Sequence, residues 1–151
     1  MSRNLAELAG ATPGDAEEIA RLEAVCFAHP RSEAALLSEI RQPERYVLVV
    51  MKSQKGLVKG YAGMEYVLDE GYITDVAVFP DRRRCGVGTA LLQELERRAR
   101  QLKLRFLTLE VRPGNLAAVR LYISLGYEES GRRRGFYTDP REDALLMTKY
   151  L

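Results

Sequence analysis

The sequence predicts an α/β fold of the α+β kind, in which helices pack on a mixed β-sheet. Its 151 residues are the length of one domain. Hydrophobic residues make up 46% and charged residues 29% of the chain, which is typical of a globular protein and excludes a disordered one. Helical periodicity and short β-rich runs alternate in the order α-α-β-β-β-α-β-α-β-β. We therefore expect a single domain over residues 1–151.

Two helices are expected before the first strand. Residues 12–15, Thr-Pro-Gly-Asp, place a proline and an acidic residue in a first turn, which is typical of a helix start. This helix should continue to about residue 27, with one apolar side made of Ile19, Leu22 and Cys26. Ser32 is a candidate N-cap for a second helix at residues 34–40.

Three strands are expected next, at residues 46–51, 59–66 and 71–79. All three are short runs in which apolar and aromatic residues dominate, as in a partly buried sheet. The polar turn at residues 52–56 joins the first two strands as a hairpin.

The second half of the chain alternates between helices and strands. A helix from Thr89 carries an apolar stripe, and a strand at residues 105–111 follows it. A second helix at residues 116–125 ends at Gly126, a typical C-cap. Two closing strands, 127–130 and 144–150, flank a polar excursion at residues 131–143.

The overall charge excludes one class of function. The chain holds 23 Lys and Arg against 21 Asp and Glu, a net charge of +2, which argues against stable binding of nucleic acid. No apolar run approaches the ~20 residues that span a bilayer, and the N-terminus lacks the apolar part of a signal peptide. Cys26 and Cys85 are too few for a disulfide framework or a structural zinc site. We expect a cytoplasmic protein without membrane association; a monomer is compatible with the sequence, which does not set the oligomeric state.

The sharpest chemical signal is Arg-Arg-Cys-Gly-Val-Gly at residues 83–88, between a strand and an amphipathic helix. The first N–H groups of a helix have no internal partner, the helix dipole is positive there, and glycine lets the backbone approach an anion closely. Residues 82–105 also hold eight basic and only two acidic residues. The pattern indicates a phosphate or pyrophosphate site, although a glycine-rich turn on a solvated basic helix is an alternative. The lysine of a Walker loop and the third glycine of the dinucleotide fingerprint are missing.

The spacing Arg83-x-x-Gly86-x-Gly88 resembles the acyl-CoA pyrophosphate loop of the GCN5-related N-acetyltransferases. The resemblance implies a mostly antiparallel sheet whose splayed strands hold acetyl-CoA, and no metal. The main chain of Val76, Ala77 and Val78 would then pair with the pantetheine arm, although a simple buried strand fits these residues equally well. The loop residues implied in cofactor binding are Arg83, Arg84, Cys85, Gly86, Val87, Gly88 and Thr89.

A longer match is similar to the ribosomal-protein-alanine N-acetyltransferases, the RimI group of that family. It comprises Leu-Glu-Val-Arg-Pro-Gly-Asn at residues 109–115, Leu-Tyr at 121–122 and Leu-Gly-Tyr at 125–127. The tail, Arg-Arg-Gly-Phe-Tyr at 133–137 and Arg-Glu-Asp-Ala at 141–144, resembles the same group. The acceptor that this resemblance implies is the N-terminal alanine of a small-subunit ribosomal protein.

The resemblance also implies roles for three residues. Glu110 would be the general base, Tyr122 the general acid on the CoA sulfur, and Asn115 a cofactor contact as well as a helix N-cap. A carboxylate in an apolar strand is costly unless it is paired or functional, so pairing of Glu110 with an arginine such as Arg112 is the structural alternative. A phenol of pKa ~10 suits an acid, although Tyr122 could equally pack beside its apolar helix neighbours.

Two residues are candidates for binding the acceptor. The resemblance implies that the acceptor groove is bordered by the segment containing Ser32, and Tyr137 is a second candidate contact. The family usually shows Pro-Trp-Ser where this chain has Pro30-Arg31-Ser32, so the peptide preference is open. Two alternatives remain: acetylation of a small amine such as a polyamine, an antibiotic or an amino acid, and a non-catalytic CoA-binding module. Retention of Glu110 and Tyr122 argues against the second.

Overall fold

A computed structural model describes residues 7–80 and 86–151. Seven strands form one sheet in the order β1-β2-β3-β4-β5-β7-β6. All neighbouring strands are antiparallel except β4 and β5, which are parallel, so the predicted mixed, mostly antiparallel sheet is confirmed. The strands are β1 (Glu7–Gly10), β2 (Tyr46–Lys52), β3 (Val58–Val67), β4 (Glu70–Val78), β5 (Phe106–Val111), β6 (Glu128–Thr138) and β7 (Arg141–Tyr150).

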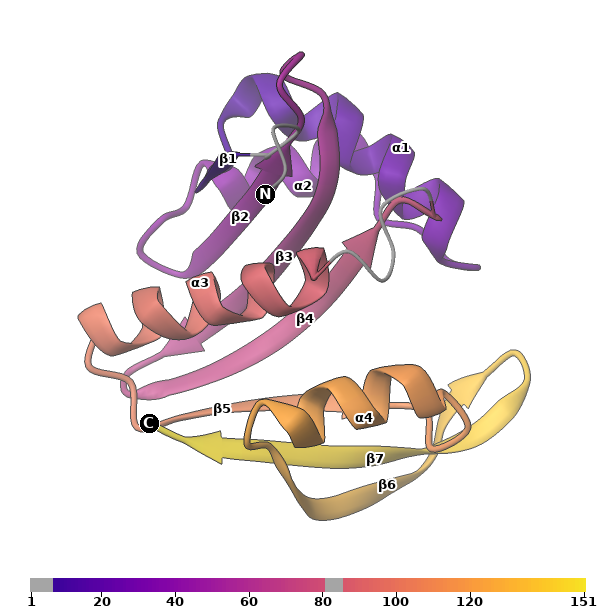
Figure 1. The fold of residues 1–151 in the computed structure, drawn as a ribbon. Coiled ribbons are helices and arrows are strands. Elements are labelled where there is room, and N and C mark those ends of the chain that lie inside the picture. Colours follow the sequence, from indigo (N-terminus) through magenta and orange to yellow (C-terminus); the bar gives the residue numbers. More distant parts are fainter. Residues whose placement is uncertain (1–6, 81–85) are drawn as a thin grey trace.

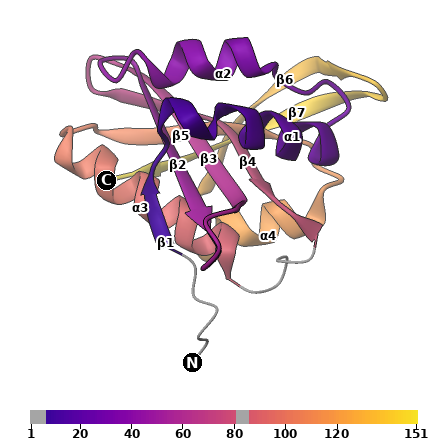
Figure 2. The same ribbon diagram turned by 90° about the horizontal axis from the view of Figure 1, so that it is seen from above.

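Helices cover both faces of the sheet. One face carries α1 (Ala16–Cys26), preceded by a short 3-10 turn (Pro13–Asp15), and α2 (Glu33–Ile40). The other face carries α3 (Val87–Gln101) and α4 (Leu116–Ser124) (Figures 1 and 2). Each face buries its own apolar cluster, because the side chains of a strand alternate between the two faces. No helix in residues 7–80 and 86–151 is long and apolar enough to cross a membrane.

The predicted helix ends are confirmed in their hydrogen bonds. The Ser32 hydroxyl accepts from the Ala35 amide at 3.1 Å, which starts α2. The Asn115 side chain accepts from the Ala118 amide at 3.2 Å, which starts α4. Each contact satisfies one of the amides that a helix leaves without a partner in its first turn. Gly126 follows α4 with φ of 97°, a backbone conformation that favours glycine.

Two expectations about strands are wrong. No strand is expected from the sequence before the first helix, but β1 lies there and pairs antiparallel with β2. Its four residues are too few to show an alternating pattern. The excursion predicted at residues 131–143 is instead the outer part of a long hairpin, in which Arg133 pairs with Ala144 and Tyr137 with Glu142. β6 is the edge strand and is almost entirely exposed, so it has no buried face to produce an alternating apolar pattern.

The feature that positions the site is the divergence of β4 from β5. These strands pair only at Glu70–Phe106, Gly71–Leu107 and Tyr72–Thr108. Beyond those pairs they separate, and a V-shaped gap between the two ribbons widens toward their carboxyl ends (Figure 1). We call this the β4–β5 opening, bordered by residues 73–78 of β4 and 109–111 of β5.

Candidate active site

Strand alternation decides which residues face each side of the β4–β5 opening. Leu107, Leu109 and Val111 of β5 pack in the apolar cluster under α3 and α4. Glu110, between two of them, therefore points to the opposite face, which α1 and α2 cover. Asp75 of β4 points to the same face, because its carboxyl lies 3.2 Å from the hydroxyl of Tyr61, a member of the cluster under α1 and α2.

Glu110 is a buried carboxylate with a single cationic neighbour among the described residues. Its side chain is 4% exposed, and Arg133 of β6 places its Nε 2.6 Å from Oε2. Burial raises the pKa of Glu110, and the charge of Arg133 opposes this shift. The carboxylate is paired as one alternative expected, but the partner is not Arg112, which instead forms an ion pair with Glu142 at 3.2 Å.

Arg112 fastens the tip of the β6–β7 hairpin to the end of β5. Its guanidinium donates to the carbonyls of Pro140 at 2.9 Å and Asp139 at 3.2 Å. It also lies over the ring of Tyr137, 4.2 Å from the centroid. The pKa of Tyr137 is raised first by burial and then by the charge of Glu110, with Arg112 opposing, so the phenol lies within electrostatic reach of Glu110.

Tyr122 approaches the opening from α4, on the face opposite Glu110. Its ring packs edge-on against Tyr127, with centroids 5.8 Å apart. Burial, followed by the charges of Tyr137 and Asp75, raises the pKa of Tyr122 to about 12. The Tyr122 hydroxyl is therefore fully protonated at neutral pH.

The strand segment predicted to bind pantetheine borders the opening. Val76, Ala77 and Val78 pair with β3 on one side, and within the described residues β5 pairs with none of them on the other. Val76 and Val78 pack toward α3 and α4, whereas Ala77 lies in the opposite cluster. A strand that lacks a neighbour offers backbone N–H and C=O groups to a ligand, which fits the amide-containing arm of acetyl-CoA.

The N-terminus of α3 fits the predicted anion site as far as it is described. Gly86 has φ of 78°, and no atom of the described residues lies within 4 Å of the position where a Cβ would stand, so on the described side the backbone is open to a close approach. Val87 begins α3, with Gly88 and Thr89 in its first turn. The side chain of Asn115 caps α4. Arg83, Arg84 and Cys85 lie outside the described residues.

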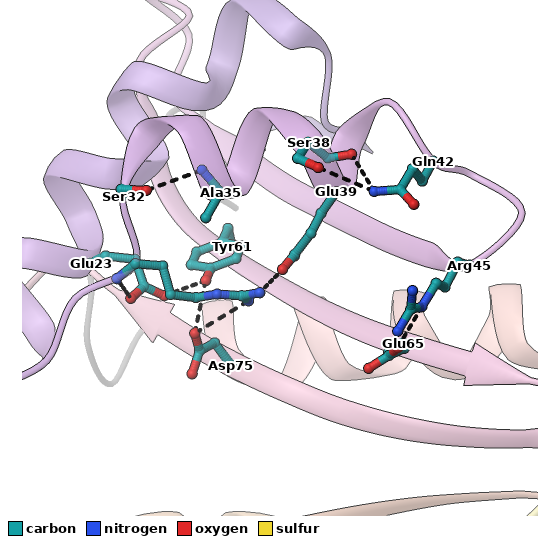
Figure 3. Close-up of polar contacts among 11 residues, drawn as sticks. Glu23, Ser32, Ala35, Ser38, Glu39, Gln42, Arg45, Tyr61, Glu65 and Asp75 are labelled. Carbon is teal, nitrogen blue, oxygen red and sulfur yellow. Dashed lines mark hydrogen bonds and ion pairs between the residues drawn. The ribbon is translucent and has the colours of Figure 1, made fainter.

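The structure brings a second set of charged residues to the opening. Asp75 is not among the site residues that the sequence predicts, yet it carries the same signal as Glu110, a carboxylate in an otherwise apolar strand. Glu23 of α1 and Tyr61 of β3 lie beside it (Figure 3). Ser32, which is expected beside the acceptor groove, is exposed, and its hydroxyl serves as the N-cap of α2.

Comparisons with known proteins agree with this geometry. The model of the acetyltransferase (GNAT) family matches residues 16–127. The chain is 41% identical over 128 residues to the ribosomal protein bS18-alanine N-acetyltransferase of Escherichia coli K12, covering 83% of this chain and 84% of that protein.

Solved structures give the same result. The crystal structure of the ribosomal-protein-S18-alanine N-acetyltransferase from Escherichia coli has a TM-score of 0.87 and 36% identity, covering 97% of this chain and 94% of that one. Ard1 from Thermoplasma volcanium has a TM-score of 0.87 and 26% identity, covering 97% and 98%. A family match across most of the chain, with a splayed pair of parallel strands at its centre, shows that this protein belongs to the GNAT family of acetyltransferases.

Proposed function

We propose that this protein transfers the acetyl group of acetyl-CoA to the N-terminal amine of a protein, and that its acceptor is the N-terminal alanine of ribosomal protein bS18. The observation that carries the proposal is the buried Glu110 in the β4–β5 opening, facing away from the α4 side from which Tyr122 approaches. The similarity to a bS18-alanine N-acetyltransferase at 41% identity supports the acceptor. A ribosomal protein as acceptor would place the reaction in the cytoplasm.

Acetyl-CoA supplies the thioester, and the chain must manage the protons. Glu110 would accept a proton from the amine nitrogen as that nitrogen bonds to the acetyl carbon, directly or through one water. Burial raises the pKa of Glu110, which makes its carboxylate a stronger base than one in water. Arg133, 2.6 Å away, keeps enough of it ionised to accept the proton.

Tyr122 would donate its proton to the sulfur as the carbon–sulfur bond breaks, so that a neutral thiol leaves. Its pKa of about 12 keeps the proton on the phenol until the thiolate forms. Val76, Ala77 and Val78 would hold the pantetheine arm by their main chain, and Gly86 to Thr89 the pyrophosphate at the start of α3. Tyr137, held by Arg112, would contact the incoming peptide.

An N-terminal amine suits this site better than a lysine does. An α-amine has a pKa of ~7.7–8.0 and a lysine ~10.4, so roughly a tenth of α-amines are neutral at pH 7 against under about a thousandth of lysines. A small polyamine is the second candidate, and one observation favours it: Glu23, Glu39 and Asp75 gather on the α1–α2 side of the opening.

The test is release of thiol from acetyl-CoA with three acceptors. They are a peptide with the N-terminal sequence of bS18 and a free alanine amine, the same peptide blocked at its N-terminus but carrying a lysine, and a polyamine. Turnover with the first alone supports the proposal. Turnover with the polyamine alone replaces it with small-amine acetylation. No turnover with any of the three, with acetyl-CoA still bound, contradicts the proposal and favours a binding module.

A further inference from the structure

A network of five charged or polar side chains joins α1, α2, β3 and β4 on the face of the sheet that Glu110 shares (Figure 3). The Tyr61 hydroxyl donates to Glu23 and lies 3.2 Å from the Asp75 carboxyl. The Arg31 amide donates to Glu23 at 2.9 Å, and the Arg31 guanidinium pairs with Glu39 and lies 3.7 Å from Asp75. These five residues form the Asp75 network.

The network has more negative groups than positive ones. It contains three carboxyl groups and one guanidinium, and Glu23 and Tyr61 are almost completely buried at 1% and 0% exposure. The Tyr61 hydroxyl contacts both Glu23 and Asp75, and Glu23 raises the pKa of Asp75, because two neighbouring carboxyl groups resist being ionised together and favour holding one proton. The free protein therefore stores one proton at this pair, or a cation must take the place of that proton.

Asp75 is the most exposed of the three carboxyl groups of the network. Its side chain is 23% exposed, and its charge acts on Tyr122 of α4 as well as on Tyr61. Asp75 and Glu110 face the same side of the sheet from opposite borders of the β4–β5 opening. Independently, Glu110 is 4% exposed and its Oε1 has no hydrogen-bond partner among the described residues, which is unusual for a buried polar atom and marks this carboxyl as a candidate for a functional role.

The proposed reaction requires two proton acceptors for the amine. An α-amine reaches the enzyme mostly as an ammonium ion with three protons, and the amide product keeps one of them. One proton must leave before the nitrogen can attack, and a second leaves as the new bond forms. Glu110 can hold only one, and the sulfur receives its proton from Tyr122.

We propose that Asp75 binds the acceptor's ammonium group and receives the first of its two protons, which leaves Glu110 free for the second. This inference rests on the proposed function. The ammonium group first takes the place of the proton stored between Asp75 and Glu23, and that stored proton leaves to the surrounding water through the exposed edge of the carboxyl. The N–H bond then breaks and an O–H bond forms on Asp75. Glu23 and Arg31 position Asp75, and Tyr61 holds its ionised form.

The titration of the pair supports this role. Burial, followed by Glu23, raises the pKa of Asp75 to about 8, with Arg31 and Tyr61 opposing the shift. That value belongs to the pair rather than to one carboxyl, and it is close to the ~7.7–8.0 of an α-amine. A proton therefore moves between the two groups at little cost in free energy.

The deciding experiment compares Asp75→Asn with the wild type on two acceptors. The first acceptor is the peptide with a free N-terminal alanine amine. The second is the same peptide with an alkoxyamine in place of that N-terminal amine, and an alkoxyamine is neutral at pH 7. With the alanine peptide, we expect kcat/KM of Asp75→Asn to be about ten- to hundredfold below that of the wild type at pH values under 8. This is the loss expected when a hydrogen bond to a charged group is removed. For the alkoxyamine we expect a change within about threefold, since no ammonium has to be bound or deprotonated.

Two controls separate this role from support of the fold. Asp69→Asn removes a carboxylate that pairs with Arg105 at the closed end of β4, at 2.7 Å, and should leave both acceptors unchanged. Acetyl-CoA binding by Asp75→Asn should equal that of the wild type. Tyr61→Phe removes the hydrogen bond that lowers the pKa of Asp75, so the acid limb of kcat/KM for the alanine peptide should move to higher pH.

Each result has a defined meaning. Equal losses with both acceptors, or an unchanged acid limb for the alanine peptide in Tyr61→Phe, would overturn the inference and leave the proposed function intact. No loss in Asp75→Asn would do the same. Wild-type turnover of a polyamine alone, lost in Asp75→Asn, would overturn the proposed function and support the inference. Absence of turnover with every amine would overturn both.

Discussion

Glu110 and Asp75 are two carboxyl groups on one face of the sheet, across the same opening, yet their surroundings differ. Glu110 is neutralised by Arg133, which reaches it from an edge strand and is itself 57% exposed. Asp75 lies against another carboxyl, a buried tyrosine and Arg31. Burial raises the pKa of both groups, but the nearest charge lowers it for Glu110 and raises it for Asp75. The neighbouring charges therefore yield one group suited to accept a proton and another that already stores one until a cation takes its place.

The largest effect expected from this comparison is that of Glu110→Gln. We expect kcat/KM to fall about 10²- to 10⁴-fold, the usual contribution of a general base, and to fall equally with the α-amine and the alkoxyamine acceptor. Steady-state thiol release measures the loss, and acetyl-CoA affinity serves as the control. A loss restricted to the α-amine would exchange the roles proposed for Glu110 and Asp75.

Tyr122→Phe should lower kcat by about 10²-fold, with little change in the KM for the peptide. Phenylalanine preserves the edge-on packing against Tyr127 and removes only the proton donor. A thioester whose leaving thiol is more acidic should recover part of the rate, because a stable thiolate needs no acid. If kcat were unchanged, the role of Tyr122 would be packing alone.

The stability of the protein should depend on pH through Asp75. Its pKa is raised by folding, so the native state binds more protons than the unfolded state, and stability falls as pH rises from about 4 toward 8. Asp75→Asn cannot ionise and should be more stable than the wild type at pH 8, by about 2 kcal/mol. Urea unfolding at pH 5 and pH 8 measures this difference, and a gain that is the same at both pH values would refute the assignment.

The smallest effect should come from Arg133→Gln. Loss of the charge that opposes the raised pKa of Glu110 should move the acid limb of kcat/KM for the alkoxyamine to higher pH, and lower the rate at pH 6 by a few-fold. Arg133 is more than half exposed, so high salt should produce part of the same shift in the wild type. If the acid limb of kcat/KM for the alkoxyamine stayed at the same pH in Arg133→Gln, Arg133 would not set the pKa of Glu110.

Residues close together in the sequence account for most of what could be predicted. Ser32 and Asn115 cap helices three residues ahead of their partners, and the stripe along α3 shows which of its sides is buried. Glu110 is conspicuous as a carboxylate in an apolar strand. The hairpin of β6 and β7 escaped prediction because an exposed edge strand buries neither face.

The amino-acid sequence by itself determined the fold class, the helix ends, the family and the candidates Glu110 and Tyr122, because local periodicity and short motifs carry that information. Only the tertiary structure decided which charges meet. Arg133 reaches Glu110 through the pairing of β5, β7 and β6. Residues 23, 31, 39, 61 and 75 meet because two helices fold onto one face of the sheet. Electrostatic interactions depend on distance and burial in space, and separation along the chain sets neither.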